Sequence, residues 1–305
     1  MHVAVCIVGF RNLHDIQNCL KALAHTRHAD FEVVICENGG EAACDAVRAA
    51  VAATGELTAP VSVRCAPGNL GYAGGVNLCM DHAASADAWW ILNPDTLPDP
   101  EALGRMCARL AAGDCHAVGC TIHSADGLVG SRGGHWNPWL ARAIALDNGR
   151  SVDAPASPDL EPRLSYLSGA SMLVGRAFVE RVGKMREDYF LYGEEVEWCL
   201  RGLASGLRLG MAADAGVLHH QGTTTGAGKR LSERGRLPVF LDERNKLLMT
   251  RDCSPALLPV VTFGALAMLF LRFARRGAWA QIGYALQGWW SGVRNQRGKP
   301  AWVGD

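Results

Sequence analysis

The 305-residue sequence lacks several patterns that would assign it to a class of protein at once. It contains eleven cysteines, but no two are spaced as CxxC, and we expect no zinc site of paired cysteines. The formal net charge is zero, which gives no reason to expect a nucleic acid partner. The first ten residues, MHVAVCIVGF, lack the basic region and cleavage site of a secretion signal. We therefore expect a cytoplasmic protein, with its cysteines as buried free thiols.

Acidic residues are missing from a long C-terminal stretch. No Asp or Glu occurs from Cys253 to Gly304. An apolar run of about sixteen residues within 256–277 is shorter than the roughly 20 residues that a spanning helix needs. Basic and tryptophan residues follow it: Arg272, Arg275, Arg276, Arg294, Arg297, Lys299, Trp279, Trp289 and Trp290.

This composition predicts that residues 251–305 form a basic, apolar helical extension. Segment 256–299 suits a helix lying on an anionic lipid surface, at the inner face of the cytoplasmic membrane. The alternative is a helical hairpin that packs on the catalytic domain or on a second subunit of a homo-oligomer.

The first 250 residues alternate short apolar runs with helical patterns, which predicts one catalytic α/β domain over 1–250. Such alternation implies a mostly parallel central sheet flanked by helices. A loop-rich segment is expected at 123–165. A strand, a turn, a second extended stretch and a polar loop are expected over 207–226. The expected strands are 2–10, 31–37, 61–65, 87–93, 116–122 and 166–176, and the expected helices are 13–25, 41–53, 74–84, 100–111 and 177–182.

Polar loops follow four of the predicted strands, and ligands bind at this edge of such sheets. Their sequences are GFRN at 9–12, ENGG at 37–40, APGNLGYAGGVN at 66–77 and NPDTLPDP at 93–100. The third loop is neither a GxGxxG nor a Walker A sequence. Its glycines nevertheless allow a ligand to approach the backbone, and the N-terminus of the helix that follows favours phosphate.

Asp95 stands just past an apolar strand, where its carboxylate can hold Mg²⁺ or Mn²⁺, with Asn93 as a neutral neighbour. His219 and His220 point in opposite directions if they lie in a strand, so one of them can join Asp95. The alternatives are a turn residue for Asp95 and a hydrogen-bonded histidine at a strand end.

The stretch FLYGEEVEWCLRG, 190–202, places three glutamates at the start of a predicted helix. Glu197 can pair with Arg201 one turn later, and glutamates suit the positive end of the helix dipole. Neither the ion pair nor the helix dipole requires a glutamate at position 195. A carboxylate beside aromatic residues can instead act as general base for a sugar hydroxyl.

These segments, in this order, resemble the family 2 glycosyltransferases of the GT-A fold, and most closely their bacterial rhamnosyltransferase-like members. The likeness spans about residues 3–226 and extends to ERN at 243–245. It rests on seven short motifs: GFRN, ENGG, GNLGYAGGVN, LNPDT, LSGASMLV, FLYGEEVEWCLR and VLHHQG.

The resemblance implies a role for each matching position. Glu195 corresponds to the catalytic base, where the family has Asp, and Glu194 is the alternative. Asp95 ends the metal-binding motif, whose first Asp is Asn93 here, and His219 joins it at the metal or diphosphate. Tyr192 and Trp198 are expected to contact the acceptor. The donor-binding positions are Phe10, Arg11 (where many members have Asn), Glu37, Asn38, Asn69, Gly71, Tyr72, Gly75, Asn93 and Asp95.

The expected activity is inverting, metal-dependent transfer of a sugar from a dTDP- or UDP-linked donor. Rhamnose is the first expectation for the sugar, and the acceptor is a cell-surface glycan or a lipid-linked glycan. Two alternatives remain: a non-catalytic scaffold or sugar-nucleotide binding protein of the same fold, and a nucleotidyltransferase. The last would be expected to carry a basic, glycine-rich first loop, and VGFRNLHD has none.

Overall fold

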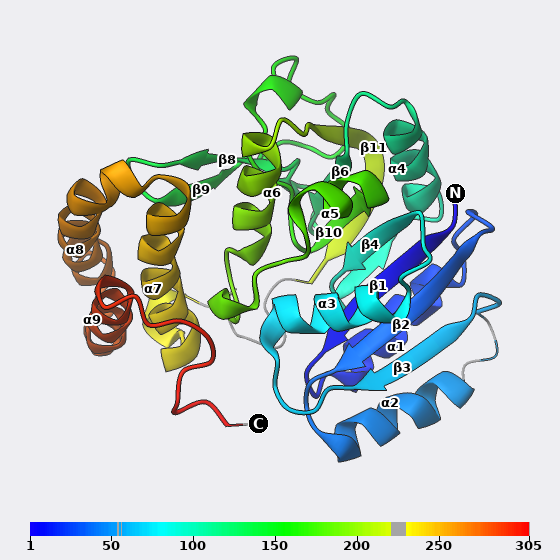
Figure 1. Ribbon diagram of the computed structural model, residues 1–305, viewed down its shortest axis with the longest axis horizontal. Helices are drawn as coiled ribbons and strands as arrows, with labels where there is room; N and C mark the ends of the chain where they lie inside the picture. The colour runs from blue at the N-terminus through cyan, green and yellow to red at the C-terminus, as the bar shows by residue number, and fades with distance from the viewer. Residues whose placement is uncertain (54, 56, 221–229, 305) are drawn as a thin grey trace.

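The computed structural model describes residues 1–53, 55, 57–220 and 230–304, and its central element is a nine-stranded sheet (Figure 1). The strand order is β3-β2-β1-β4-β10-β6-β11-β5, and β7 pairs with β6. The strands are β1 (Val3–Gly9), β2 (Phe31–Glu37), β3 (Val61–Cys65), β4 (Ala88–Leu92), β5 (Thr96–Pro98), β6 (Ala117–His123), β7 (Val129–Ser131), β10 (Ser171–Gly175) and β11 (Leu209–His219), and a separate hairpin contains β8 (Gly134–Asn137) and β9 (Arg142–Ala145).

The predicted mostly parallel α/β sheet is confirmed. β1 pairs in parallel with β2 and β4, and β2 pairs in parallel with β3. β10 lies antiparallel between β4 and β6. Alternate residues of β1 serve the two faces of the sheet: Val5 belongs to one core cluster and Cys6 to the other.

Helices cover both faces of this sheet. Side chains of α1, α2 and α4 enter the core cluster of one face, whereas those of α3, α5 and α6 enter that of the other (Figure 1). The helices are α1 (Leu13–Leu23), α2 (Glu41–Ala53), α3 (Gly71–His82), α4 (Ala102–Ala111), α5 (Arg176–Val182), α6 (Glu194–Ala204), α7 (Arg236–Cys253), α8 (Leu258–Ala274) and α9 (Trp279–Val293).

Two sequence expectations need correction. α3 begins at Gly71, three residues before the predicted start, because the Asn69 side chain accepts a hydrogen bond from the Gly71 N–H at 3.1 Å. The segment 123–165 is loop-rich, as expected, and it also contains the short strands β7, β8 and β9. The predicted turn near residue 213 is a register shift within one strand, β11. The polar loop predicted at 221–226 lies outside the described residues.

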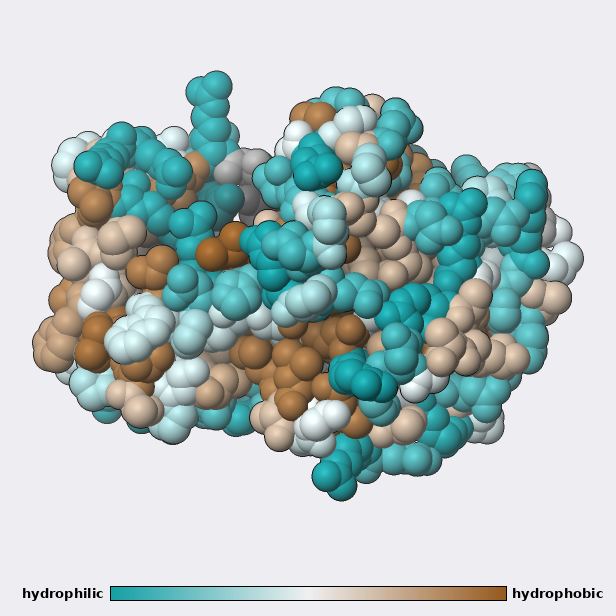
Figure 2. All heavy atoms as spheres, turned by 90° about the horizontal axis from the view of Figure 1, so that it is seen from above, coloured by the Kyte–Doolittle hydropathy of each residue, from teal (hydrophilic) through white to brown (hydrophobic). Residues whose placement is uncertain are grey.

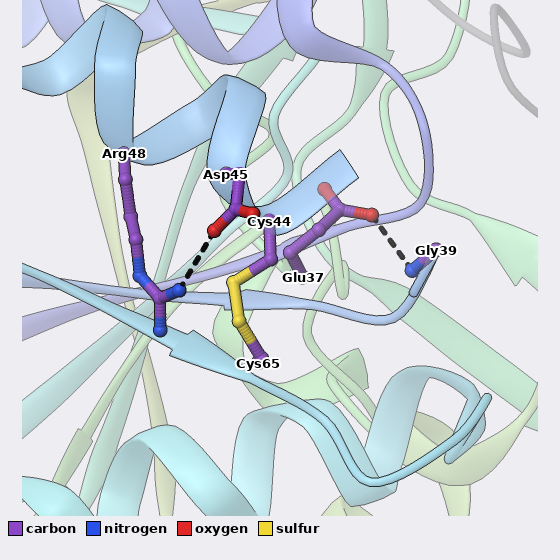
Figure 3. Close-up of a disulfide and its surroundings, with 6 residues drawn as sticks. All are labelled: Glu37, Gly39, Cys44, Asp45, Arg48 and Cys65. Atoms are coloured by element: carbon purple, nitrogen blue, oxygen red, sulfur yellow. Dashed lines mark hydrogen bonds and ion pairs between the residues drawn. A yellow bond between two sulfur atoms is a disulfide. The ribbon is translucent and has the colours of Figure 1, made fainter. Parts of the chain in front are cut away.

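The expectation that all cysteines are free thiols is wrong for one pair. Cys44, in the first turns of α2, forms a disulfide with Cys65 at the end of β3, and their Cα atoms are 5.7 Å apart (Figure 3). Parallel pairing of β2 with β3 brings α2 and the end of β3 together, which sequence spacing could not reveal. The nine other cysteines are free, and eight of them are buried.

The three C-terminal helices form a bundle at one end of the molecule (Figure 1). α7 packs mainly on α9, and α8 contacts both. The apolar segment is longer than the sequence count indicated. Pro255–Ala274, 20 residues, is the only segment among the described residues that is long and apolar enough to cross a membrane, by length and composition alone. α7 runs across residue 250, and the division at that residue stays a prediction.

Candidate active site

The polar loops predicted from the sequence meet at one edge of the sheet. β1, β2 and β4 run in parallel, so the loops that follow them leave at the same edge. Because β10 is antiparallel, the segment before it reaches this edge too, and the Asn93 N–H donates to the Ala170 carbonyl at 2.9 Å. The edge therefore carries residues from four separate parts of the chain.

Glu37 is the last residue of β2, and its side chain is buried. One of its two carboxylate oxygens has hydrogen-bond partners. Its Oε1 accepts hydrogen bonds from the N–H of Arg11 at 2.9 Å and of Gly39 at 2.8 Å (the latter in Figure 3). Its Oε2 has no hydrogen-bond partner within the part of the chain that the structure describes. Arg11 adopts a positive φ of 56°, and its guanidinium donates to the Gly39 carbonyl and lies 5.2 Å from the Phe10 ring centre. The first two loops are thus tied together around Glu37.

The third loop is tied to the second by Asn38, which is buried. The Asn38 amide donates to the Gly71 carbonyl at 3.0 Å, and its oxygen accepts from the Leu70 N–H at 3.3 Å. Gly71 has a φ of +73°, and a side chain there would meet the Phe190 carbonyl. At Gly75 a side chain would meet Val8 of β1. Glycine at both positions keeps the start of α3 close to the sheet edge.

Asp95 and His219 lie together, as the sequence predicted for one of the two histidines. The His219 Nε2 is 3.1 Å from the Asp95 Oδ1, whereas the His220 side chain is exposed. His219 ends β11, whose pairing with β5 carries it to the segment that follows Asp95. Asn93 is partly buried, and its carbonyl accepts a hydrogen bond from the Thr96 hydroxyl.

A carboxylate beside an imidazole is a donor set that fits Mg²⁺ or Mn²⁺, with Mn²⁺ the better match for nitrogen. No cluster of three or more His, Cys, Asp or Glu ligands occurs among the described residues. A metal held by Asp95 and His219 would therefore take its other ligands from water and from the phosphates of a substrate.

The stretch FLYGEEVEWCLRG forms a loop and the first turns of α6. Glu194 is buried, and its Oε2 has no partner among the described residues. Burial, and after it the charge of Glu195, raises the pKa of Glu194 to about 8. Glu195 is only partly buried, and its Oε2 accepts from the Gly193 N–H at 3.2 Å. Burial also raises the pKa of Glu195, while hydrogen bonds from backbone N–H groups oppose that rise. Glu197 pairs with Arg201, as expected.

Tyr72 connects the two halves of the site. Its hydroxyl donates to the Gly169 carbonyl at 2.6 Å, and a side chain at Gly169 would contact Glu195. Burial raises the pKa of Tyr72, and the charges of Glu194, Glu195 and Asp95 raise it further. The Tyr72 hydroxyl therefore links the start of α3 to the backbone beside Glu195.

A groove of about 1190 Å³ opens beside Glu195. It is lined by the β8–β9 hairpin, the start of α6, and the facing sides of α7 and α8. Tyr192 lines it, in agreement with an acceptor contact. Trp198 does not: its ring is fully buried against Phe178, and its N–H donates to the Gly183 carbonyl. Trp198 is a core residue, and the expectation that it contacts an acceptor is corrected.

Sequence reasoning missed several residues near this groove. Trp139 and Leu140 come from the segment predicted as loop, and both side chains are more than half exposed in the groove wall. Arg244 and Asn245 belong to the ERN stretch, which was noted only as an extension of the likeness. Their buried side chains contact the loop before Glu194. Polar residues at buried positions of a helix were the signal that could have identified them.

Comparisons with known proteins assign this arrangement of sheet and converging loops to the glycosyltransferases of the GT-A fold. Residues 2–236 match the family described as "Glycosyltransferase like family 2", and the chain belongs to that family.

The chain is similar to the low-salt glycan biosynthesis hexosyltransferase Agl10 of Haloferax volcanii, with 22% identity over 76% of each chain. Among solved structures it is similar to the mannosyltransferase PcManGT from Pyrobaculum calidifontis in complex with GDP-Man and Mn²⁺. That match has a TM-score of 0.60 and 13% identity, and covers 97% of this chain and 88% of the other.

A second structural match is TarS 1–349 of S. aureus in complex with UDP-GlcNAc. It has a TM-score of 0.53 and 12% identity, and covers 97% of this chain and 93% of the other. The GT-A fold and glycosyltransferase activity are therefore confirmed, and the nucleotidyltransferase alternative loses its support.

Proposed function

We propose that the chain transfers a hexosyl residue, with inversion, from a nucleoside diphosphate sugar to an acceptor hydroxyl in the groove beside Glu195. The observation that carries this proposal is the position of Glu195. It is a partly buried carboxylate that lines a large groove, and it lies beside Gly169, whose carbonyl accepts a hydrogen bond from Tyr72 at the start of α3. The groove can admit an acceptor on one side of the carboxylate while the donor loops lie on the other.

In the proposed reaction the Glu195 carboxylate removes the proton of the acceptor hydroxyl. The acceptor oxygen forms its bond to the anomeric carbon from the face opposite the leaving group. The bond between that carbon and the diphosphate oxygen breaks, and its electron pair leaves with the nucleoside diphosphate. We assign the role of base to Glu195 and not to Glu194, because Glu195 lines the groove whereas the Glu194 side chain is buried and does not line it.

We assign the donor to the cradle of Glu37, Asn38, Asn69 and the start of α3. The free Oε2 of Glu37 is a hydrogen-bond acceptor that a base N–H or a ribose hydroxyl can satisfy. Asp95 and His219 would hold Mg²⁺ or Mn²⁺, which supplies positive charge to stabilise the departing diphosphate. The structure of PcManGT with GDP-Man and Mn²⁺ supports this choice of cofactor.

Rhamnose remains our first candidate for the sugar, by family likeness alone. The hexosyltransferase relative and the neighbours solved with GDP-Man and UDP-GlcNAc support a wider panel. Donors to test are dTDP-rhamnose, UDP-glucose, UDP-galactose, UDP-GlcNAc and GDP-mannose.

The lining of the groove favours a lipid-linked glycan as acceptor. Its walls combine the exposed apolar side chains of Trp139, Leu140 and Met268 with the basic side chains of Arg275 and Arg276. An apolar chain joined to a glycan through phosphate has both matching features: apolar surface and negative charge.

The outer face of α8 and α9 continues this apolar and basic surface, and we propose that it lies on an anionic membrane. Phe263 is 73% exposed and Trp279 is 67% exposed. Figure 2 shows hydrophobic residues at the surface of the end of the molecule that holds these helices. Arg275 and Arg276 are exposed at the end of α8, where they can contact lipid phosphates. A homo-oligomer contact through the same face is the competing proposal.

Replacement of Glu195 by Gln tests the proposed chemistry. The variant keeps the size of the side chain but cannot accept the proton, and we expect transfer to fall at least ~100-fold while donor binding survives. Glu197→Gln is the matched control, since it alters a neighbouring buried glutamate that pairs with Arg201 instead of lining the groove. Full activity of Glu195→Gln would refute the assignment.

A further inference from the structure

The loop that precedes α6 has an unusual backbone. Phe190 and Tyr192 are non-glycine residues with φ values of 69° and 73°, and Gly193 follows with 92°. A positive φ at a non-glycine residue is unfavourable and persists only where the surroundings impose it. The Gly193 N–H then donates to Glu195, so the shape of this loop sets the position of that carboxylate.

On one side the loop is held by α3. The Tyr72 N–H donates to the Phe190 carbonyl at 2.9 Å. Gly71 packs so closely on the same carbonyl that a side chain there would clash with it. This contact joins the loop to the start of the helix that we assign to the donor.

On the other side the loop is held by two neighbouring residues of α7. The Asn245 amide nitrogen lies 2.7 Å from the Tyr192 carbonyl, 2.8 Å from that of Leu191 and 3.3 Å from that of Tyr189. The Arg244 guanidinium donates to the Tyr189 carbonyl at 2.7 Å, and its Nε donates to the Asn245 side-chain oxygen at 2.9 Å.

These hydrogen bonds offset two unfavourable features: the burial of two polar side chains, and loop carbonyls that lie outside the sheet. Arg244 is 1% exposed and Asn245 is 4% exposed, and burial of such groups is unfavourable unless their hydrogen bonds are satisfied. The carbonyls of Leu191 and Tyr192 belong to an irregular loop outside the sheet, so they need donors from elsewhere, and the Tyr189 carbonyl accepts from Asn245 and Arg244 in addition to the Leu191 N–H. One carboxamide and one guanidinium meet both requirements.

We infer that Asn245, supported by Arg244, is a positioning residue that imposes the loop shape which aims Glu195 into the groove. The inference rests on the proposed function only for the role of Glu195. We call the hydrogen bonds from Asn245 and Arg244 to the carbonyls of Tyr189, Leu191 and Tyr192 the brace. Its effect on the loop can be measured without any enzymatic turnover.

Asn245→Ala removes the amide that spans the three carbonyls. We expect the loop to relax, the peptide over 189–196 to exchange its amide hydrogens at least ~10-fold faster, and more distant peptides to be unchanged. For the donor that wild type uses, kcat should fall about 10- to 100-fold, because small displacements of a catalytic group have effects of that size. The dissociation constant for the nucleoside diphosphate should change less than about twofold, because Asn245 does not contact the donor cradle.

Gln281→Ala is the matched control. The Gln281 amide, buried in α9, also braces two backbone carbonyls, of Ser232 at 2.7 Å and Arg234 at 3.3 Å, but neither belongs to the segment 189–196. This variant should leave the exchange of 189–196 near its wild-type rate. If Asn245→Ala does not fold, Arg244→Lys keeps the charge and gives a smaller change in the same direction.

Unchanged exchange over 189–196 in a folded Asn245→Ala protein would overturn the inference. Equally fast exchange over 189–196 in the Gln281 control would do so too, since it would show a general effect of destabilisation. A third outcome separates the two proposals: faster exchange over 189–196 in Asn245→Ala, together with no turnover of any donor by the wild-type protein. This result would support the role of Asn245 in the loop while refuting the proposed function.

Discussion

Glu194→Gln offers the sharpest physical prediction from this site. The carboxyl group is buried, and its Oε2 has no partner within the described residues. Its pKa rises from 4.5 to about 8, through burial first and the charge of Glu195 second. Gln has nearly the same shape but cannot ionise, so the variant isolates the consequence of that raised pKa.

The size of the effect follows from proton binding. In the unfolded chain the group loses its proton near pH 4.5, whereas in the folded chain it holds the proton until about pH 8. Between these values the unfolded state binds fewer protons, so the free energy of unfolding falls as the pH rises. The stabilising contribution is complete below pH 4.5 and lost above about pH 8, and at about 1.4 kcal/mol per pH unit it amounts to at most about 5 kcal/mol.

Urea unfolding of wild type and Glu194→Gln at pH 5, 6, 7 and 8 measures this directly. We expect the difference in free energy of unfolding to grow in favour of the variant by several kcal/mol from pH 5 to pH 8. Parallel stability curves would refute the reasoning, because Glu194 would then titrate normally. The variant should also keep its transferase activity at pH 7. If that activity were lost, the role of base would move from Glu195 to Glu194.

Three further predictions test other parts of the structure. Asp95→Ala should weaken Mn²⁺-dependent donor binding at least ~10-fold in a calorimetric titration, because one of the two proposed protein ligands is lost. Reduction of the Cys44–Cys65 disulfide, or Ser at both positions, should lower the free energy of unfolding by about 3 kcal/mol, from a sequence separation of 21 residues, as measured by urea unfolding. Phe263→Asp, which places a charge on the most exposed apolar side chain of α8, should reduce sedimentation with phosphatidylglycerol vesicles several-fold.

Each of these has an outcome that would contradict it. Donor titration that is unchanged in Asp95→Ala would remove that residue from the metal site. Equal unfolding curves with and without reductant would show that the disulfide contributes nothing to stability. Equal vesicle binding by Phe263→Asp and wild type would exclude α8 as the lipid contact, and a shift from dimer to monomer in that variant would favour the homo-oligomer.

Much of the fold could be predicted from local pattern. β2 and β3 occupy the predicted residues, because their apolar runs end at clear turn residues. The alternation of strands with helices predicts the sheet edge that carries the site, and the sequence predicts Asp95 and His219 as a pair, whose side chains lie 3.1 Å apart. These features depend on short segments and on a rule of topology, both of which are written in the sequence.

Contacts between distant parts of the chain could not be predicted from local sequence pattern. Trp198 looked like a candidate acceptor contact because of its position in the motif, yet the packing of α5 on α6 buries it against Phe178. The Cys44–Cys65 pair depends on strand pairing, and the brace by Asn245 joins residues more than fifty positions apart. In each case the partner is set by tertiary structure, which periodicity does not encode.

The proposed metal-dependent use of a nucleotide sugar is tested most directly by a donor screen. Purified protein would be incubated with dTDP-rhamnose, UDP-glucose, UDP-galactose, UDP-GlcNAc or GDP-mannose, in the presence of Mn²⁺ or of EDTA. Donor binding and release of the nucleoside diphosphate would be measured. We predict that one donor is bound and slowly hydrolysed with Mn²⁺ and not with EDTA. Neither binding nor hydrolysis of any donor with Mn²⁺ would contradict the account, and would favour a scaffold that keeps the fold without the chemistry.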